Sequence, residues 1–179
     1  MKELSLHLLD ILENSVRAQA SCIRILVVED TKKNLLLLTI QDNGKGMGEE
    51  ELSRVRDPFY TGQKKKVGLG IPLLEQLTRL CLGNLEISSH PGEGTSIVAR
   101  FQLDHIDLPP LGRLPDTLMA IFASHPDIEI EYEHVRDECR WAFNTKKLME
   151  ELDVQNTQDL MTLLWGIKEW IEYHEEHMG

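Results

Sequence analysis

The residues best suited to chemistry stand where an apolar run ends, in the segment LTIQDNGKGM at 38–47. Asp42 has two interpretations. It is a turn residue, because an Asp side chain accepts hydrogen bonds from nearby backbone N–H groups. Alternatively it is the floor of a pocket, because an ionised carboxylate accepts hydrogen bonds from a ligand amine such as adenine N6. Gly44 and Gly46 would then let a flat ring approach the backbone without a Cβ in the way.

Three further segments carry residues that suit a nucleotide. DILENS at 10–15 places Asp10 and Asn14 one helical turn apart on one face. RDPFYTG follows at 56–62, and VGLGIPLL at 67–74 opens a helix whose N-terminal N–H groups can bind phosphate. The chain contains no GxxxxGK[ST] motif, and the segment after Asp42 lacks the later ligands of an EF-hand loop.

Together and in this order, the four segments resemble the N, G1, F and G2 boxes of the GHKL ATPases. That superfamily includes DNA gyrase, the heat-shock ninety chaperones, the histidine kinases and the mismatch-repair ATPases. The segment GTSIVARFQL at 94–103 resembles the last strand of a histidine-kinase ATP-binding domain. The resemblance covers roughly residues 1–104. It implies an α+β fold of the two-layer sandwich type, with a mixed sheet and helices on one face.

The resemblance also implies roles for the matching residues, with ATP and Mg²⁺ as cofactors. Asn14 resembles the magnesium ligand, and Asp42 resembles the carboxylate that reads adenine, so ATP should be preferred over GTP. Thr95 resembles a residue that assists Asp42, although a strand-edge Thr is the alternative. The other positions implied to bind ATP are Gly44, Gly46, Met47, Phe59, Tyr60, Lys64, Lys66, Gly68, Leu69 and Gly70.

Catalysis is assigned to Asp10 by the same resemblance. Gyrase-like members have a water-activating glutamate one turn before the magnesium asparagine, whereas Asp10 is shorter by one methylene. Asp10 could therefore orient water or the hydroxyl of a partner. The sequence starts directly at the N box, so we expect any phosphoacceptor to lie on another protein, as in the stand-alone anti-sigma-factor kinases. The alternative function is an ATP-gated interaction switch with slow hydrolysis. A homodimer is compatible with either.

These residues must be positioned by a mixed set of elements. Helical spacing predicts helices over 3–19, 48–55 and 71–81. Alternating and apolar runs predict a hairpin of strands at 22–30 and 34–41, followed by a second strand pair over 84–103. After a proline-rich segment at 104–116, the pattern predicts a helix, a hairpin around 136–138 and a final helix over 156–178.

Charge and composition divide the chain at the same segment. We predict an ATP-binding domain over 1–105 and an acidic α+β C-terminal region over 106–179. The first holds 14 acidic residues and 13 Lys or Arg, and the second holds 16 and 6. The acidic surface of the second region is either simply solvated or a docking site for a basic partner protein, and it excludes nucleic acid. Scattered cysteines, no signal peptide and no membrane-spanning apolar run predict a cytoplasmic protein.

Overall fold

The computed structural model describes residues 3–57, 70–154 and 157–177. Its first part contains one long helix, two strand pairs and two shorter helices: α1 (Leu4–Arg17), β1 (Cys22–Asp30), β2 (Leu35–Asp42), α2 (Glu49–Arg54), α3 (Gly70–Leu80), β3 (Asn84–His90) and β4 (Gly94–Gln102). Its second part contains α4 (Leu114–Ser124), β5 (Glu129–Arg136), β6 (Cys139–Asn144), α5 (Thr145–Glu151) and α6 (Thr157–Glu176). Each described element matches a predicted one to within a few residues, except for α5, where the prediction continued the last strand.

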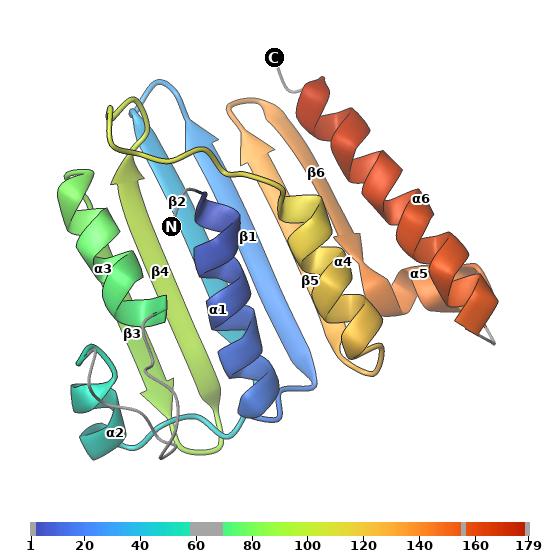
Figure 1. The fold of residues 1–179 in the computed structure, drawn as a ribbon, viewed down its shortest axis with the longest axis horizontal. Helices are drawn as coiled ribbons and strands as arrows, with labels where there is room; N and C mark the ends of the chain where they lie inside the picture. The colour runs from blue at the N-terminus through green and yellow to red at the C-terminus, as the bar shows by residue number, and fades with distance from the viewer. Residues whose placement is uncertain (1–2, 58–69, 155–156, 178–179) are drawn as a thin grey trace.

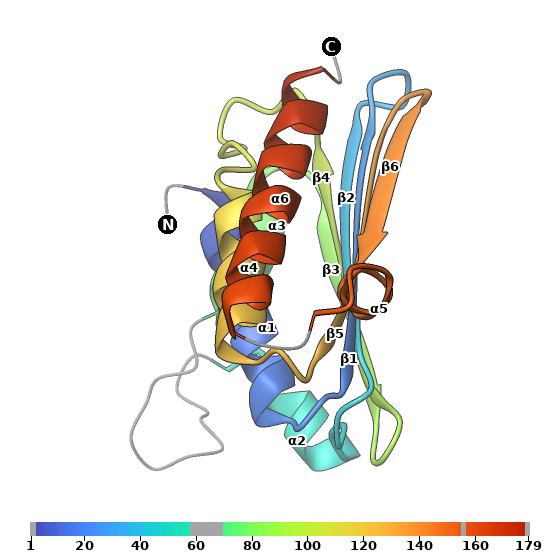
Figure 2. The ribbon, with the colours of Figure 1, turned by 90° about the vertical axis from the view of Figure 1, so that its right-hand side faces the viewer.

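All the strands join one six-stranded sheet in the order β3-β4-β2-β1-β5-β6. Neighbours are antiparallel except for β1 and β5, which run parallel. The long helices α1, α3, α4 and α6 lie on one side of this sheet (Figures 1 and 2). The predicted α+β class, with a mixed sheet and helices on one face, is therefore confirmed.

Alternation along the strands explains why one face is covered. In β1 the side chains of Ile23, Ile25 and Val27 are buried beneath the helices, whereas Arg24 between them is exposed on the other face. Successive side chains of a strand point to opposite faces, so a strand with one apolar face needs only one layer of helices. The other face of the sheet is left open in the part of the chain that is described (Figure 2).

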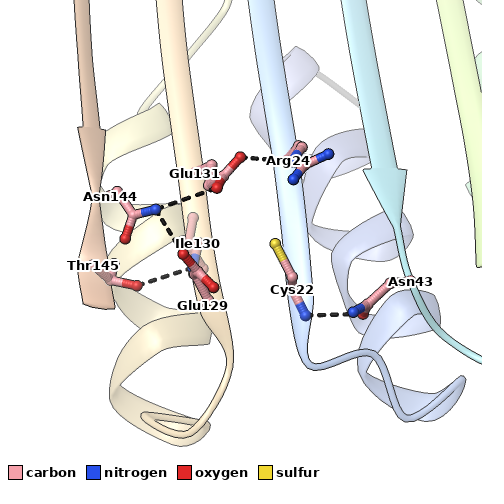
Figure 3. Close-up of polar contacts among 8 residues, drawn as sticks. All are labelled: Cys22, Arg24, Asn43, Glu129, Ile130, Glu131, Asn144 and Thr145. Atoms are coloured by element: carbon pink, nitrogen blue, oxygen red, sulfur yellow. Dashed lines mark hydrogen bonds and ion pairs between the residues drawn. The ribbon is translucent and has the colours of Figure 1, made fainter. Parts of the chain in front are cut away.

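Polar contacts on the open face join the strands on either side of the predicted boundary (Figure 3). The guanidinium Nε of Arg24 lies 2.6 Å from a carboxylate oxygen of Glu131. Within the second region, the amide of Asn144 on β6 donates to Glu129 on β5 at 2.7 Å and to Glu131, the partner of Arg24, at 3.3 Å. The boundary at residue 105 stays a prediction, but β5 and β6 extend the same sheet rather than form a second one.

The segment between the two regions also holds the start of α1. The first N–H groups of an α-helix lack partners within the helix. Here the N–H groups of Leu4 and Ser5 donate to the carbonyl oxygens of Pro110 and Leu111, at 3.0 and 2.9 Å. The proline-rich segment therefore crosses the sheet and caps the helix that carries Asp10 and Asn14. None of the described helices combines the length and apolar character needed to cross a bilayer.

Candidate functional site

Asp42 is the last residue of β2, and its carboxylate is held from two sides. The Ser15 hydroxyl of α1 donates to Oδ2 at 2.8 Å, and the Gly44 N–H donates to Oδ1 at 2.9 Å. A carboxylate has about four acceptor positions, so both oxygens can still accept from a ligand. The turn interpretation and the pocket interpretation are therefore compatible, because the turn bond to Gly44 fixes the carboxylate that a ligand amine would meet.

Thr95 lies directly opposite Asp42 in the register of β2 and β4, so both side chains point to the same face. Its Oγ1 is 2.9 Å from Oγ of Ser89, on the neighbouring strand β3. The Ser89 hydroxyl donates to the Gly94 carbonyl at 2.8 Å, so the hydrogen between the two hydroxyls comes from Thr95. Oγ1 of Thr95 is then left as an acceptor beside Asp42.

Ser89 also fixes the loop that follows Asp42, because its Oγ accepts a hydrogen bond from the N–H of Met47 at 2.9 Å. Within this loop Gly46 has φ +66°, and a Cβ there would collide with the carbonyl of His90. At Gly44 a Cβ would lie 2.7 Å from the carbonyl oxygen of Ala18. Glycine is thus required at both positions by the protein's own backbone, before any ligand is considered.

Asp10 lies half-buried on α1, four residues before Asn14. Burial raises the pKa of the Asp10 carboxyl, the charge of Glu13 raises it further, and Arg17 opposes the shift. The start of α3 lies against this side chain, since a Cβ on Gly70 would be 2.8 Å from the Asp10 Cβ. The structure therefore brings Asp10 next to the helix that follows the predicted phosphate-binding glycines.

Asn14 is exposed on the same helix, and its Oδ1 accepts a hydrogen bond from Arg17 at 3.1 Å. An exposed amide oxygen fits Mg²⁺, which keeps several waters and takes few protein ligands. The i,i+3 contact with Arg17 is weak enough to be exchanged for a metal ion. The remaining predicted residues, Phe59, Tyr60, Lys64, Lys66, Gly68 and Leu69, lie outside the described residues.

Two residues that organise the site were missed from the sequence. Ser15 stands beside Asn14 in DILENS, but its bond to Asp42 depends on how α1 lies against the end of β2. Ser89 lies in an ordinary strand segment with no motif around it. Side-chain hydroxyls have no spacing signature, so only the packing of α1, β2 and β3 could have revealed them.

A hollow of about 380 Å³ opens near the same end of the sheet. It is lined in part by Arg24, Gln41 and Ser96. These alternate with the buried residues Ile25, Ile40 and Ile97, so they belong to the open face. The hollow is also lined by Asp42, Ser89 and Thr95, so it reaches the site from the open face, whereas Asp10 and Asn14 are not among its lining residues.

Comparison with known protein families agrees with this geometry. The family model described as "Histidine kinase-, DNA gyrase B-, and HSP90-like ATPase" matches residues 2–105. The chain belongs to this ATPase family. The match includes the described site residues, from Asp10 and Asn14 on α1 to Thr95 on β4. The predicted relationship to the GHKL ATPases is thus confirmed.

Similar proteins of known sequence are sensor histidine kinases. YvrG of Bacillus subtilis is 31% identical over 98 residues, which cover 52% of this chain and 17% of that protein. YxdK of the same organism is 36% identical over 66 residues, which cover 34% of this chain and 20% of that protein. The chain thus spans no more than a fifth of either relative.

Among solved structures, the N-terminal domain of a DNA repair protein has a similar fold. The TM-score is 0.53 with 14% sequence identity, over 79% of this chain and 52% of that chain. At this identity the likeness shows the fold alone. Because the similarity covers more of the chain than the 1–105 region, the solved fold resembles this ATPase in part of its C-terminal region as well.

Proposed function

We propose that this ATPase binds ATP with Mg²⁺ and transfers the γ-phosphate to a partner protein. The observation that carries the proposal is the Asp42 carboxylate, held between Ser15 and Gly44 at the end of a strand in a domain of this family. The resemblance to sensor histidine kinases favours transfer to a protein. A partner docked on residues 106–179 would supply the acceptor, and a cytoplasmic location would supply the ATP.

Each site residue then has a physical task. Asp42 accepts the adenine amine, and Thr95 Oγ1 supplies a second acceptor beside it. Asn14 contributes an oxygen to Mg²⁺, which in turn would neutralise charge on the phosphates. Asp10 would take the proton of the attacking group as that group bonds to the γ-phosphorus, while the bond from the γ-phosphorus to the bridging oxygen breaks and ADP leaves. Its raised pKa suits proton uptake, because a stronger base accepts a proton more readily.

Nucleotide binding is tested with Asp42→Asn. The substitution replaces one acceptor oxygen by an amide that would face the adenine amine donor to donor. Loss of a charged hydrogen bond costs about 1.5–3 kcal/mol, so ATP affinity should fall by at least about 10-fold, and by about 100-fold if the amide is also repelled. Calorimetric titration with a non-hydrolysable ATP analogue measures this. Unchanged affinity in a folded variant would remove the adenine assignment.

Phosphate transfer is tested by incubating the protein and γ-labelled ATP with candidate partner proteins. Label on a partner, lost with Asp42→Asn, supports the kinase. Release of free phosphate without labelled protein supports the second candidate function, an ATP-gated switch with slow hydrolysis. Two observations favour the switch. The Asp10 side chain is shorter than the water-activating glutamate that gyrase-like members have at this position, and Pro110 and Leu111 cap α1. That capping links the site helix directly to the C-terminal region.

A further inference from the structure

The last helix, α6, has two different sides. Its buried stripe includes Ile167 and Ile171. Successive helix residues are about 100° apart, so Lys168 and Tyr173 lie on opposite sides of this stripe. The Lys168 side faces α4, because its ammonium group lies 2.8 Å from Asp116. The Tyr173 side therefore faces away from α4, toward the outer edge of the sheet.

Aromatic side chains continue from the core to that outer side. Trp141 of β6 is buried, and its ring centroid is 5.3 Å from that of Trp170 on α6. The Trp170 ring is tilted against that of His174, with ring centroids 4.1 Å apart, and Tyr173 stacks on His177 with centroids 4.2 Å apart. Trp170 is 38% exposed and Tyr173 is 59% exposed. We call Trp170, Tyr173 and His177 the aromatic row.

The aromatic row lies beside an edge of the sheet. β6 is the last strand in the order, and no strand of the described residues lies beyond it. Figure 1 shows α6 running along the β6 side of the sheet and past it, while Figure 2 places α6 in the helix layer. One further strand beside β6 would thus lie beneath α6. Natural sheets commonly protect edges with proline or charged residues, especially lysine. CRWAFN at 139–144 contains neither proline nor lysine, and its one charged residue, Arg140, is already paired with Glu133 at 2.7 Å.

Both faces of an added strand would contact side chains of this protein, one face in the helix layer and the other on the open face of the sheet. Every second side chain would point into the helix layer, in line with Trp141 and Phe143 and beneath Trp170 and Tyr173. Those side chains should be apolar. The alternate ones would lie on the open face beside the exposed residues Arg140 and Ala142. Strand addition of this kind obtains affinity from backbone hydrogen bonds and specificity from alternate side chains.

Charge decides which chain can occupy this edge. Residues 106–179 carry 16 acidic residues against 6 Lys or Arg. A second copy would bring an equally acidic region to within about a Debye length, which is about 8 Å at physiological ionic strength. A basic segment would instead be attracted. We propose that the β6 edge and the aromatic row bind an extended, basic segment of another protein, in which apolar residues alternate with lysine or arginine.

The probe is a synthetic peptide of alternating valine and lysine, titrated into the full chain without nucleotide. The inference rests on the proposed function, in which a partner protein docks on residues 106–179. Because peptide binding is measured without ATP, failure of docking can be distinguished from failure of ATP binding or phosphate transfer. Two control peptides are used. One has proline at the central valine, which removes a backbone N–H, and the other has glutamate in place of every lysine. Calorimetry measures affinity, and hydrogen exchange measures protection of the β6 amides.

We expect the valine–lysine peptide to bind, to protect β6 amides and to bind at least about 10-fold more tightly than either control. Tyr173→Ala should weaken it about 10-fold, whereas Trp165→Ala should not. Trp165 is a matched control because it is 63% exposed on a different side of α6. Tyr173 is also exposed, so its loss should leave the fold intact.

Three outcomes would overturn the proposal. The first is no binding of the valine–lysine peptide. The second is binding that tolerates proline and Tyr173→Ala, which would show attraction by charge alone. The third is a dimer in sedimentation experiments that Tyr173→Ala converts to monomer, which would show that a second copy occupies the edge.

Discussion

Two regions of the sheet are held together in different ways: the region around the C-terminal end of β2, called the Asp42 end, and the outer strand pair, called the β5–β6 end. At the end of β2, the Ser15 hydroxyl donates to Asp42, the Ser89 hydroxyl accepts from the N–H of Met47, and glycines allow backbone segments to approach closely. At the β5–β6 end, large aromatic rings pack on one another; the ring centroids of Trp141 and Tyr132, for example, are 5.0 Å apart. At the Asp42 end, the side chains orient one another, and oxygen atoms of Asp42 and Thr95 remain able to accept hydrogen bonds from a ligand. The second end gains stability from apolar area.

The contrast predicts which substitutions should change ligand binding and which should change the free energy of unfolding. Removing a polar group at the Asp42 end should change what the protein binds or transfers, with little effect on folding. Removing a ring at the Trp141 end should do the reverse. Substitutions at four positions test the contrast, beginning with the largest expected effect.

Asp10→Ala should lower phosphate transfer, or phosphate release if the protein is a switch, by about 10²–10⁴-fold, the usual contribution of a positioned acid or base. The stability of the variant should be unchanged or higher, because burial and Glu13 disfavour the Asp10 charge. Steady-state turnover and thermal unfolding measure the two effects. Glu138→Ala is the control, since Glu138 is an exposed acid in the turn between β5 and β6 that pairs with Lys32.

Asp10→Glu sharpens the assignment. If the aspartate positions water poorly because it is short, the longer side chain should raise ATP hydrolysis. If it orients a partner hydroxyl, transfer should fall without a gain in hydrolysis. Turnover in Asp10→Ala equal to that of the wild type, in both reactions, would show that Asp10 is not catalytic.

Trp141→Ala should reduce the free energy of unfolding by about 3–5 kcal/mol, as other large-to-small changes in packed cores do. Its side chain is 6% exposed, and its ring contacts Tyr132, His134 and Trp170. Urea unfolding measures the loss. Trp165→Ala should change stability by no more than about 0.5 kcal/mol. If the folded Trp141→Ala protein lost ATP affinity as strongly as stability, the two ends would not be separable.

His7 provides a pH test of the first helix. Burial lowers its pKa from 6.5 to about 4, and its Nδ1 has no hydrogen-bond partner among the described residues. Between these values the unfolded chain binds a proton that the folded protein does not. Stability should therefore fall as pH drops from 6.5 toward 4, by about 2 kcal/mol at pH 5.

His7→Leu should remove this part of the acid sensitivity while keeping wild-type stability or better at pH 7. Urea midpoints at pH 7 and pH 5 give the difference. The exposed His125 is a control, because His125→Leu should retain the full wild-type loss. His134, the buried histidine of the β5–β6 end, differs from His7 because its Nε2 lies 2.9 Å from Glu29. Equal acid sensitivity in wild type and His7→Leu would contradict the assignment.

Asn14→Ala should have the smallest effect. Magnesium-free nucleotide binding should be retained, and the gain in affinity on adding Mg²⁺ should fall by about 10-fold, as expected for loss of a metal-site group. ATP affinity with and without Mg²⁺ measures this. Arg17→Ala is the control, since it frees Asn14 Oδ1 and should preserve or increase the magnesium gain. The same magnesium dependence in Asn14→Ala and wild type would exclude the metal role.

Much of the fold could be predicted because its signals are local. The alternation in CIRILVVED and the turn before NLLLLTIQ predict β1 and β2 without reference to the rest of the chain. The C-terminal hairpin was predicted for the same reason. Its attachment was not, because the parallel pairing of Ile23 with Ile130 joins residues more than a hundred positions apart. Such pairing has no local pattern.

The candidate site divides in the same way. Asp10, Asn14, Asp42 and Thr95 belong to motifs whose order along the chain is readable, and family membership follows from that order. The residues that orient them, Ser15 and Ser89, could not be predicted from the sequence. Ser89 reaches Met47 and Gly94 only after β3 pairs with β4.

The sequence by itself determined the elements other than α5, the family and the identity of the residues proposed to meet ATP, because periodicity and motif order can be read along the chain. Only the tertiary structure decided that Ser15 holds Asp42, that Pro110 and Leu111 cap α1, and that α6 overhangs the β6 edge. The physical reason is that hydrogen bonds and ring contacts act over a few ångströms in space. Their partners are therefore chosen by packing and not by distance along the chain.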